Sequence, residues 1–252
     1  MLNFKNTTIA YIASFLLLML ASLFFYFSGW IYIWLALSYL GIIAVASFSI
    51  RSNFFLKAFS GTRSNNRNKV ALTFDDGPHP VFTTQVLSLL KRYDAKATFF
   101  CIGKHMETYP EVVQKIKEAG HVIGNHSYSH KNTIAFNGTK CWIQEIEKTD
   151  TIINSYGGPK PKLFRPPFGV TTPHLAKAVE LTNHRVVGWN IRPFDTSIKQ
   201  KEAIVKHIKR RVKPGAVILL HDTHDRIPYI LEHLLLFLQQ NDYELVSVNE
   251  LM

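Results

Sequence analysis

The distribution of apolar residues divides the chain into two unlike parts. From Ile9 to Phe48 there is no Asp, Glu, Lys or Arg, so about forty consecutive positions carry no charge. A membrane-spanning helix needs roughly 20 apolar residues, so this stretch is long enough for two. Gly29 interrupts it near the middle. The pattern predicts an N-terminal transmembrane helical hairpin with spans at Ile9–Phe27 and Trp30–Phe48.

Two other interpretations of the uncharged stretch stay open. A signal peptide is also apolar and N-terminal, but this stretch exceeds an ordinary h-region, and Ala44-Val45-Ala46 is a marginal cleavage context. A buried hairpin of a soluble protein is the second alternative, although no polar positions mark an outer face. The predicted organisation is a membrane anchor over residues 1–50, a basic polar linker over 51–68 and a globular domain over 69–252.

Basic residues flank the apolar stretch on both sides. Lys5 precedes it, the turn between the spans has no cation, and the cations that follow are Arg51, Lys57, Arg63, Arg67 and Lys69. The positive-inside rule predicts from this asymmetry that the globular domain faces the cytoplasm. The formal net charge of +11 comes with neither zinc-finger spacing nor an RNA-binding aromatic signature, so we expect no nucleic-acid partner.

After the linker, short apolar runs alternate with helical patterns. Apolar residues recur at i, i+3, i+4 and i+7 most clearly from Ile227 to Leu238, and again in Trp142–Ile153 and Val112–Ile116. The candidate strands are Lys69–Phe74, Ala97–Cys101, His121–Gly124, Leu163–Arg165, Arg185–Trp189, Ala216–His221 and Tyr243–Val248. Repeated strand–helix units predict an α/β domain with a parallel sheet, either open or closed into a barrel.

The two cysteines, Cys101 and Cys141, lack the spacing of a metal site. Cys101 lies in the apolar run Ala97–Ile102, which predicts a buried free thiol. Two cysteines are too few to indicate a redox compartment.

The first candidate chemistry lies in Thr73–Pro78, with the sequence T-F-D-D-G-P. It follows the apolar run Val70–Leu72, so it falls where a strand ends and a loop begins. The adjacent carboxylates of Asp75 and Asp76 repel each other. A metal cation would relieve that repulsion by binding one carboxylate and leaving the other free to accept a proton. A solvated Asp-Gly turn without chemistry is the alternative.

Two histidines further along the chain favour the metal. His126 and His130 are four residues apart, and on a helical turn this spacing would place both imidazoles on one face, where they can chelate one ion. Two more motifs follow, R-P-P-F-G over Arg165–Gly169 and L-L-H-D over Leu219–Asp222.

In this order, the four motifs resemble the polysaccharide deacetylases that carry a NodB homology domain, carbohydrate esterase family 4. The resemblance runs from Asn68 to the C-terminus, and the ordered set is far more specific than any single motif. It implies an irregular (β/α) barrel of about seven parallel strands, here preceded by the transmembrane hairpin. Such barrels place their chemistry at the carboxyl ends of the strands, where each motif falls.

The resemblance implies a metal site and a catalytic pair. Asp75 corresponds to the family's general base, and His221 to its general acid. Asp76, His126 and His130 correspond to the metal ligands. The implied cofactor is one divalent metal. The ligand types favour zinc, and cobalt, nickel or manganese are alternatives.

Further positions carry over in supporting roles. Arg165 corresponds to the arginine that holds the catalytic aspartate. Asp195 corresponds to the aspartate that tunes the acid, because a carboxylate near an imidazole raises the imidazole pKa. The backbone N–H of Phe168 corresponds to the oxyanion donor. The expected substrate-binding residues are Pro167, Phe168, Trp189 and Leu220.

Some positions depart from the family pattern. Arg192 stands where the family has an aspartate, Thr196 replaces a tryptophan that lines the acetyl pocket, and Phe168 stands where tyrosine is common. We interpret Asp222 as a structural loop residue or cap. These departures leave the hydrolytic residues in place and leave the substrate open.

The resemblance implies a hydrolase that removes N-acetyl groups from N-acetylglucosamine-type sugars. The substrate would be a polysaccharide such as peptidoglycan, a chitin-like polymer or an exopolysaccharide, or else a lipid-linked glycan. A catalytically silent, membrane-anchored carbohydrate-binding module on the same fold is the alternative, but such a module needs neither a base nor an acid.

The expected partners are the glycan and the lipid bilayer, and the sequence predicts no oligomeric state. The family's usual polymers lie outside the cytoplasm, which conflicts with the positive-inside prediction. A lipid-linked sugar on the cytoplasmic face would reconcile the two.

Overall fold

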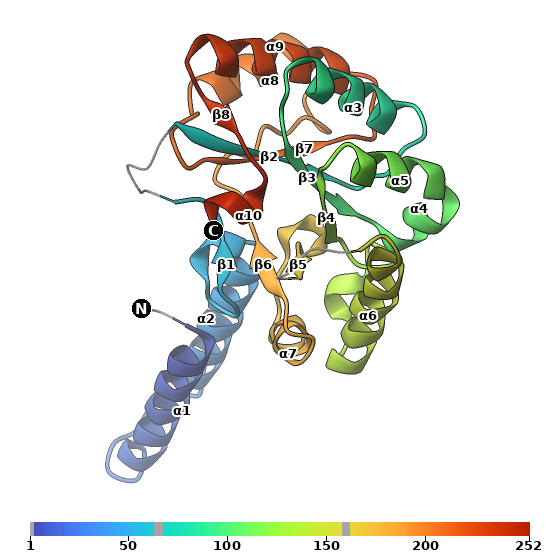
Figure 1. Cartoon of the computed structure of the whole chain (residues 1–252). Coiled ribbons are helices and arrows are strands. Elements are labelled where there is room, and N and C mark those ends of the chain that lie inside the picture. The colour runs from blue at the N-terminus through green and yellow to red at the C-terminus, as the bar shows by residue number, and fades with distance from the viewer. Residues whose placement is uncertain (1–2, 63–67, 158–161) are drawn as a thin grey trace.

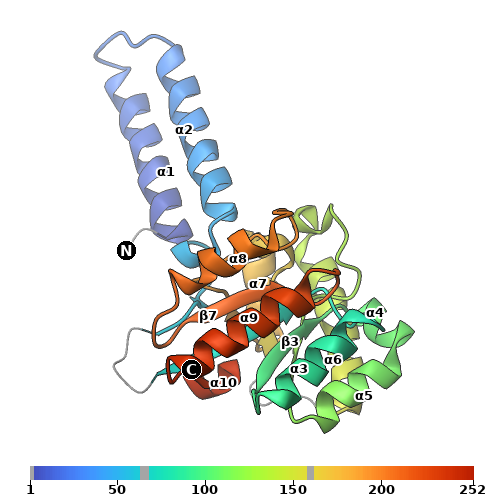
Figure 2. The same cartoon turned by 90° about the horizontal axis from the view of Figure 1, so that it is seen from above.

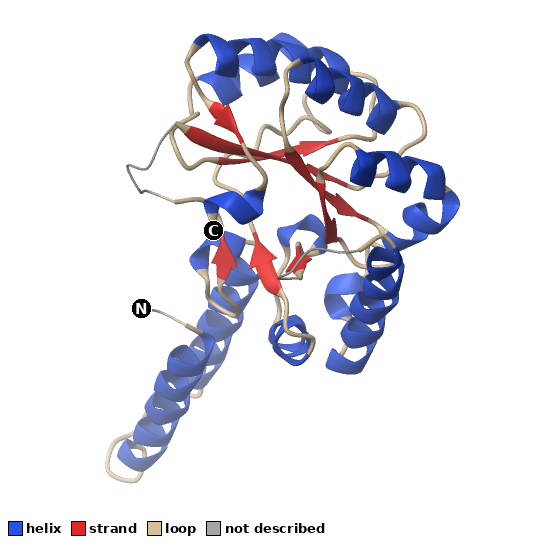
Figure 3. Ribbon diagram, in the orientation of Figure 1, coloured by secondary structure: helices blue, strands red, loops and turns tan. Residues whose placement is uncertain are grey.

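Parallel strands form the centre of the globular part, and helices cover them on the outside (Figure 3). The computed structural model describes residues 3–62, 68–157 and 162–252. The strands are β1 (Ala58–Phe59), β2 (Lys69–Asp75), β3 (Ala97–Cys101), β4 (Val122–Asn125), β5 (Leu163–Phe164), β6 (Arg185–Val187), β7 (Val217–His221) and β8 (Glu244–Leu245). The helices are α1 (Phe4–Ala21), α2 (Trp30–Ser47), α3 (Phe82–Arg92), α4 (Gly103–Thr108), α5 (Pro110–Glu118), α6 (Thr139–Ser155), α7 (Pro173–Leu181), α8 (Lys201–Lys209), α9 (Ile227–Gln240) and α10 (Val248–Leu251), with short 3-10 turns η1 (Ile50–Ser52), η2 (Ile134–Phe136) and η3 (Pro167–Gly169).

Seven of the strands run side by side in the order β1-β6-β5-β4-β3-β2-β7, and every neighbouring pair is parallel. The eighth strand, β8, pairs with β2 outside this path. Within the described residues, no pairing joins β7 to β1, so the barrel stays open there. The predicted irregular barrel of about seven parallel strands is confirmed.

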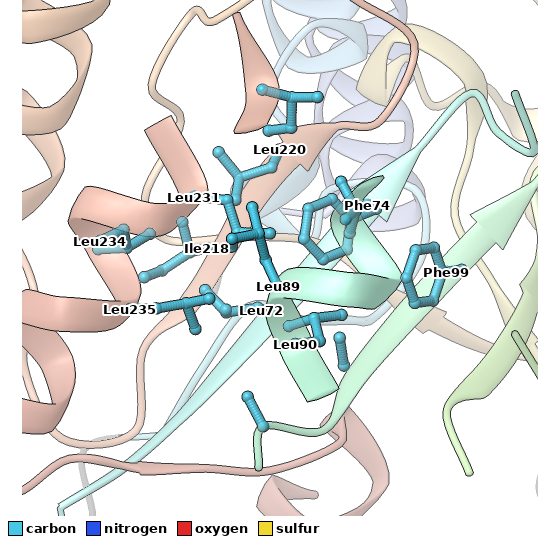
Figure 4. Packing of buried hydrophobic residues seen from close by; sticks show 14 of the residues in the cluster. Leu72, Phe74, Leu89, Leu90, Phe99, Ile218, Leu220, Leu231, Leu234 and Leu235 are labelled. Atoms are coloured by element: carbon cyan, nitrogen blue, oxygen red, sulfur yellow. The ribbon is translucent and has the colours of Figure 1, made fainter. Parts of the chain in front are cut away.

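Alternate residues of β2 face two different environments, because successive side chains of a strand point to opposite sides. Leu72 and Phe74 point outward and pack against α3 and α9 (Figure 4). Thr73 and Asp75 point into the barrel and are also buried. The periodicity predicted for α9 is confirmed, since its buried stripe consists of Ile227, Ile230, Leu231, Leu234, Leu235 and Leu238.

Two sequence expectations need correction. The predicted strand Tyr243–Val248 is reduced to β8, because Ser247 and Glu250 form a capping box that begins α10. The predicted linker 51–68 contributes β1, which pairs with β6. Two residues are too short for a periodic pattern, so the sequence did not reveal this strand. Residues 63–67 of that linker lie outside the described residues.

Helices α1 and α2 form an antiparallel hairpin that projects away from the barrel (Figures 1 and 2). Each has 18 residues, with mean hydropathies of 1.5 and 1.8, and only 6% of each is buried. This exposure contradicts the alternative of a hairpin buried in a soluble core. By length and composition both helices could cross a membrane, and a signal sequence would have the same properties.

The base of the hairpin is attached to the barrel by backbone hydrogen bonds. The N–H of Phe4 donates to the carbonyl of Phe54, and the N–H of Thr171 donates to the carbonyl of Ser47, each over 2.9 Å. Ile50, just after α2, is buried in a hydrophobic cluster that also contains Phe164 and Trp189. Thr171 follows the η3 turn closely, so the hairpin meets the domain beside the loop after β5.

Candidate active site

A cleft of about 240 Å³ opens at the carboxyl ends of the central strands. The loops after β2, β4, β5 and β6 and the end of β7 line it, with Asp75, Asp76, His126, His130, Phe168, Gly169, Trp189, Arg192, Phe194, Thr196, Ser197, Leu219 and His221. The predicted base, acid and metal ligands therefore converge in one place. Phe168 and Trp189, expected to bind substrate, also lie there.

The three predicted metal ligands lie close together. Nε2 of His126 is 3.4 Å and Nε2 of His130 is 3.3 Å from Oδ1 of Asp76, and one ligand atom from each residue lies within 4.8 Å of the others. The histidines do not lie on a helical turn. They lie in the loop after β4, where Ser127 and His130 have positive φ angles of 64° and 48°. The loop geometry, and not a helix face, brings the two imidazoles together.

Neighbouring groups hold this loop and orient its first imidazole. The Glu145 carboxylate on α6 accepts hydrogen bonds from the backbone N–H groups of Tyr128 and Ser129 and from the Ser129 hydroxyl. Nδ1 of His126 lies 2.7 Å from the Arg165 carbonyl oxygen. A carbonyl can only accept, so Nδ1 carries a proton, and Nε2 is the ring nitrogen that faces Asp76. The sequence analysis missed Glu145, whose only signal was its place in the α6 pattern.

The electrostatics of the three ligands fit a divalent cation. Burial favours the neutral form of Asp76, but a hydrogen bond from His126 and the nearby imidazoles outweigh it and lower the pKa of Asp76. Burial, with His126 beside it, lowers the pKa of His130 to about 4. Burial also opposes charge on His126, yet Asp75 and Asp76 raise its pKa, so the pocket favours a positive charge at that point. The ionised carboxylate of Asp76 and the imidazoles of His126 and His130 are therefore suitable ligands for a divalent cation.

Asp75 is held from inside the barrel by Arg165. Both side chains are buried, and Nη1 of Arg165 donates to Oδ1 of Asp75 over 2.7 Å. The same guanidinium donates to the Thr73 hydroxyl and to the carbonyls of Val187 and Gly188. With its donors fixed in this way, Arg165 orients one carboxylate oxygen, while Oδ2 lies 3.8 Å from Nε2 of His126. Arg165 therefore lies behind the cleft and positions Asp75.

His221 lies on the opposite side of the cleft from the histidine loop. It is the register partner of Asp75 on β7, and its Nδ1 is 2.9 Å from Oδ1 of Asp195. Burial opposes charge on His221, but the hydrogen bond and charge of Asp195 outweigh it and raise the pKa to about 9. Nε2 is 4.0 Å from Oδ2 of Asp76. His221 thus presents a protonated Nε2 near the metal ligands.

The carboxylate of Asp195 is itself surrounded by donors. It is fully buried, accepts from the backbone N–H of His221 over 2.8 Å, and lies 3.2 Å from Nε2 of His224. Arg226 donates to its backbone carbonyl. Burial favours the neutral acid, but His221 and His224 lower the pKa of Asp195. The sequence analysis missed His224 and Arg226, since no spacing rule links them to Asp195.

Two expected substrate-binding residues do not line the cleft. Leu220 is fully buried in the outer core between β7 and the helices (Figure 4). Its neighbour Leu219 lines the cleft instead, because side chains alternate along a strand. Pro167 is also buried, and Gly169 lines the cleft from the same turn. At Gly169 a Cβ would lie 2.4 Å from Trp189, so this turn needs glycine to approach the indole.

Asp222 and Cys101 do not line the cleft. Asp222 is fully buried against Gly77 and accepts a hydrogen bond from the Thr83 hydroxyl. Burial raises its pKa to about 7. Cys101 is a buried free thiol, as predicted, and Cys141 is exposed.

Comparison with known sequences agrees with this geometry. The polysaccharide deacetylase family model matches residues 62–187. A peptidoglycan-N-acetylglucosamine deacetylase of Bacillus cereus is 40% identical over 166 residues, which cover 66% of this chain and 59% of that protein. Peptidoglycan-N-acetylmuramic acid deacetylase PdaC of Bacillus subtilis is 33% identical over 186 residues, 74% of this chain and 39% of that protein. The chain therefore matches only part of the length of these two relatives.

Solved structures give the same result. The Bc1960 peptidoglycan N-acetylglucosamine deacetylase superposes with a TM-score of 0.72 and 34% identity, over 77% of this chain and 92% of that one. BA3943, a CE4 family pseudoenzyme from Bacillus anthracis, shares the fold with a TM-score of 0.70 at 24% identity, over 77% of this chain and 68% of that one. With the family model, the sequence identity and the fold in agreement, the chain belongs to the polysaccharide deacetylase family.

Proposed function

We propose that this protein is a metal-dependent N-deacetylase, which hydrolyses the acetamide of N-acetylglucosamine-type sugars. One observation carries the proposal. Asp75 and His221, a carboxylate and a protonated imidazole, are register partners on neighbouring strands and lie on either side of the candidate metal ligands. Amide hydrolysis needs a group that accepts a proton from water and a group that donates one to the departing amine.

Asp76, His126 and His130 are the proposed ligands of one divalent cation, with zinc favoured by one carboxylate and two imidazoles. Such a cation, when bound, polarises the acetamide carbonyl and activates water as a nucleophile. Glu145 holds the backbone of the histidine loop, and the Arg165 carbonyl fixes the His126 tautomer. These contacts keep the ligands in place before an ion arrives.

The protein side chains then move the protons. Oδ1 of Asp75 is occupied by Arg165, so Oδ2 is the oxygen that accepts a proton from the attacking water. Nε2 of His221 donates a proton to the nitrogen of the departing amine, while Nδ1 stays bound to Asp195. The proposed donor to the developing oxyanion is the backbone N–H of Phe168, which lines the cleft.

The acetyl methyl group needs an apolar wall in the cleft. Trp189 and Leu219 are largely buried and both line it, and Gly169 packs against the indole edge. Thr196, which replaces the family's usual tryptophan, lies at the exposed part of the same cleft. Trp189 and Leu219 are therefore the proposed acetyl contacts.

A catalytically silent carbohydrate-binding module remains the alternative function. The fold does not decide between the two, because a pseudoenzyme shares it. The buried Arg165–Asp75 pair and the buried Asp195 favour the enzyme. Burying charged groups costs free energy, and a binding module gains nothing from orienting a base and an acid.

We propose that α1 and α2 anchor the domain to a bilayer as two spans. Ser47, at the end of α2, accepts a hydrogen bond from Thr171, two residues after Gly169 of the cleft. This contact supports a substrate that lies close to the membrane surface. The flanking cations support a cytoplasmic domain, whereas the peptidoglycan substrates named for the relatives support an outer one. Protease digestion of intact spheroplasts decides the side, since only an outward domain is cleaved.

The activity is tested with the full-length chain in detergent. We expect one divalent ion per chain by elemental mass spectrometry, and release of acetate from N-acetylglucosamine oligomers or peptidoglycan. Dialysis against a chelator should abolish the release, and added zinc should restore it. The Lys199→Gln variant, an exposed cation outside the cleft, serves as a preparation control. Stoichiometric metal without acetate release from any N-acetylated glycan would favour the binding module.

A further inference from the structure

We propose that the cleft takes an N-acetylated glycan that carries an acidic group, and that Arg192 binds that group. The proposal rests on the proposed function only in taking the occupant to be a glycan. Arg192 lines the same cleft as the candidate metal ligands and is exposed to solvent. Among the residues that the structure describes, its guanidinium has neither an ion-pair partner nor a hydrogen-bond acceptor.

The backbone on both sides of Arg192 is fixed. Ile191 is buried and forms a parallel bridge with Ile218 of β7, and Pro193 is buried. His207 on α8 lies beside the Arg192 backbone. The side chain therefore starts from a rigid point on the wall of the cleft.

Two aromatic rings flank the guanidinium. Its carbon lies 5.7 Å from the ring centroid of Trp189 and 5.0 Å from that of Phe194. Contacts with ring faces leave the N–H edges of a guanidinium available. Those edges form a planar fork that matches the two oxygens of a carboxylate or phosphate.

Within residues 3–62, 68–157 and 162–252, no acidic side chain is paired with Arg192. Of the acidic residues that line the cleft, Asp75 is bound to Arg165, and Asp76 faces the imidazoles of the candidate metal site. A divalent cation in that site would place a further positive charge in the same cleft. An anion bound beside Arg192 would therefore interact favourably with both positive charges.

The surface behind Arg192 is also basic. The ring of Phe194 contacts His207 edge to face, with centroids 6.4 Å apart, and Arg211 Nη1 lies 3.2 Å from His207 Nδ1. Burial, together with the charges of Arg211 and Arg210, lowers the pKa of His207. A packing role for Arg192 alone would explain the ring contacts, but it would not explain why an exposed guanidinium lines the cleft beside the candidate metal ligands.

Binding is measured in the Asp75→Asn background, so that no substrate is turned over. Three N-acetylglucosamine tetramers serve as probes: the neutral tetramer, one with lactyl carboxylates on alternate sugars, and one with a phosphate. Calorimetry on the full-length, metal-loaded chain should show that at least one acidic tetramer binds about tenfold or more tightly than the neutral one. A preference for either acid supports the proposal and identifies the anion.

Arg192→Gln in the same background should remove this preference, Arg192→Lys should keep part of it, and the control Lys199→Gln should keep all of it. Equal affinity for neutral and acidic tetramers in the presence of Arg192, or a preference that survives Arg192→Gln, would overturn the proposal. Because the readout is binding, the acid preference stands or falls separately from acetate release by the wild-type chain.

Discussion

The two walls of the cleft use the same side chain with opposite proton affinities. On the wall after β4, burial and His126 lower the pKa of His130 to about 4, so its imidazole is neutral at physiological pH. On the wall formed by β7, Asp195 raises the pKa of His221 to about 9, so its imidazole is protonated. A neutral imidazole can bind a metal and a protonated one can donate a proton. The neighbouring residues, and not the histidine itself, therefore decide the role.

The first and largest prediction tests the histidine loop. Replacing His126 or His130 with alanine should abolish both bound metal and acetate release, because two remaining ligands hold a divalent ion poorly. Elemental mass spectrometry and an acetate assay give the two readouts. His174→Ala, an exposed histidine on α7, is the matched control and should keep both. Full metal occupancy and normal turnover in His130→Ala would show that His130 is not a metal ligand.

The sequence predicted the two walls to different extents. The metal side depends on Asp76, His126 and His130, which lie in short motifs that follow apolar runs, so a spacing rule finds them. Their geometry was less predictable. The expected helical turn is in fact a loop with left-handed residues, held by Glu145 from a distant helix.

The acid side depends on contacts that no local pattern encodes. Asp195 is 26 residues from His221, and the resemblance alone pointed to it. The sequence did not indicate His224 and Arg226, because only the fold brings them next to Asp195. Leu219 lines the cleft where Leu220 was expected. A short buried strand has apolar side chains on both faces, so its sequence does not indicate which residues face the cleft.

The second prediction separates metal binding from base catalysis. Asp75→Asn keeps the shape of the side chain but cannot accept a proton, so metal should remain while turnover falls by about 10³- to 10⁴-fold. The fall should lie in the upper part of the usual range, because Arg165 loses its buried counter-charge. Loss of metal in this variant would instead exchange the roles of Asp75 and Asp76.

The third prediction removes the acid. His221→Ala should retain metal and reduce turnover by about 10²- to 10³-fold, because solvent water can partly replace the proton donor. The loss should be smallest for substrates whose leaving group needs no protonation, such as an activated acetyl ester. Equal losses on the ester and on the amide sugar would mean that His221 acts on some other step.

The last and smallest effect concerns the pH at which the acid wall stops working. His221 must be protonated to act, so activity should be present below its pKa and lost as the pH rises through it. Asp195 raises that pKa to about 9, and a bound cation nearby should bring the basic limb to a somewhat lower pH.

Asp195→Asn removes the charge but keeps an oxygen and a nitrogen in place, so the basic limb should move to still lower pH. Asp225→Asn is the control, because Asp225 is close to His221 in the sequence but its side chain is 80% exposed. This variant should leave the basic limb at the same pH. The ionisation of the attacking water can produce a limb in the same range. The pKa of that water would not depend on Asp195. If the basic limb stays at the same pH in Asp195→Asn, the limb therefore reports the ionisation of the water, and His221 does not set the pH dependence.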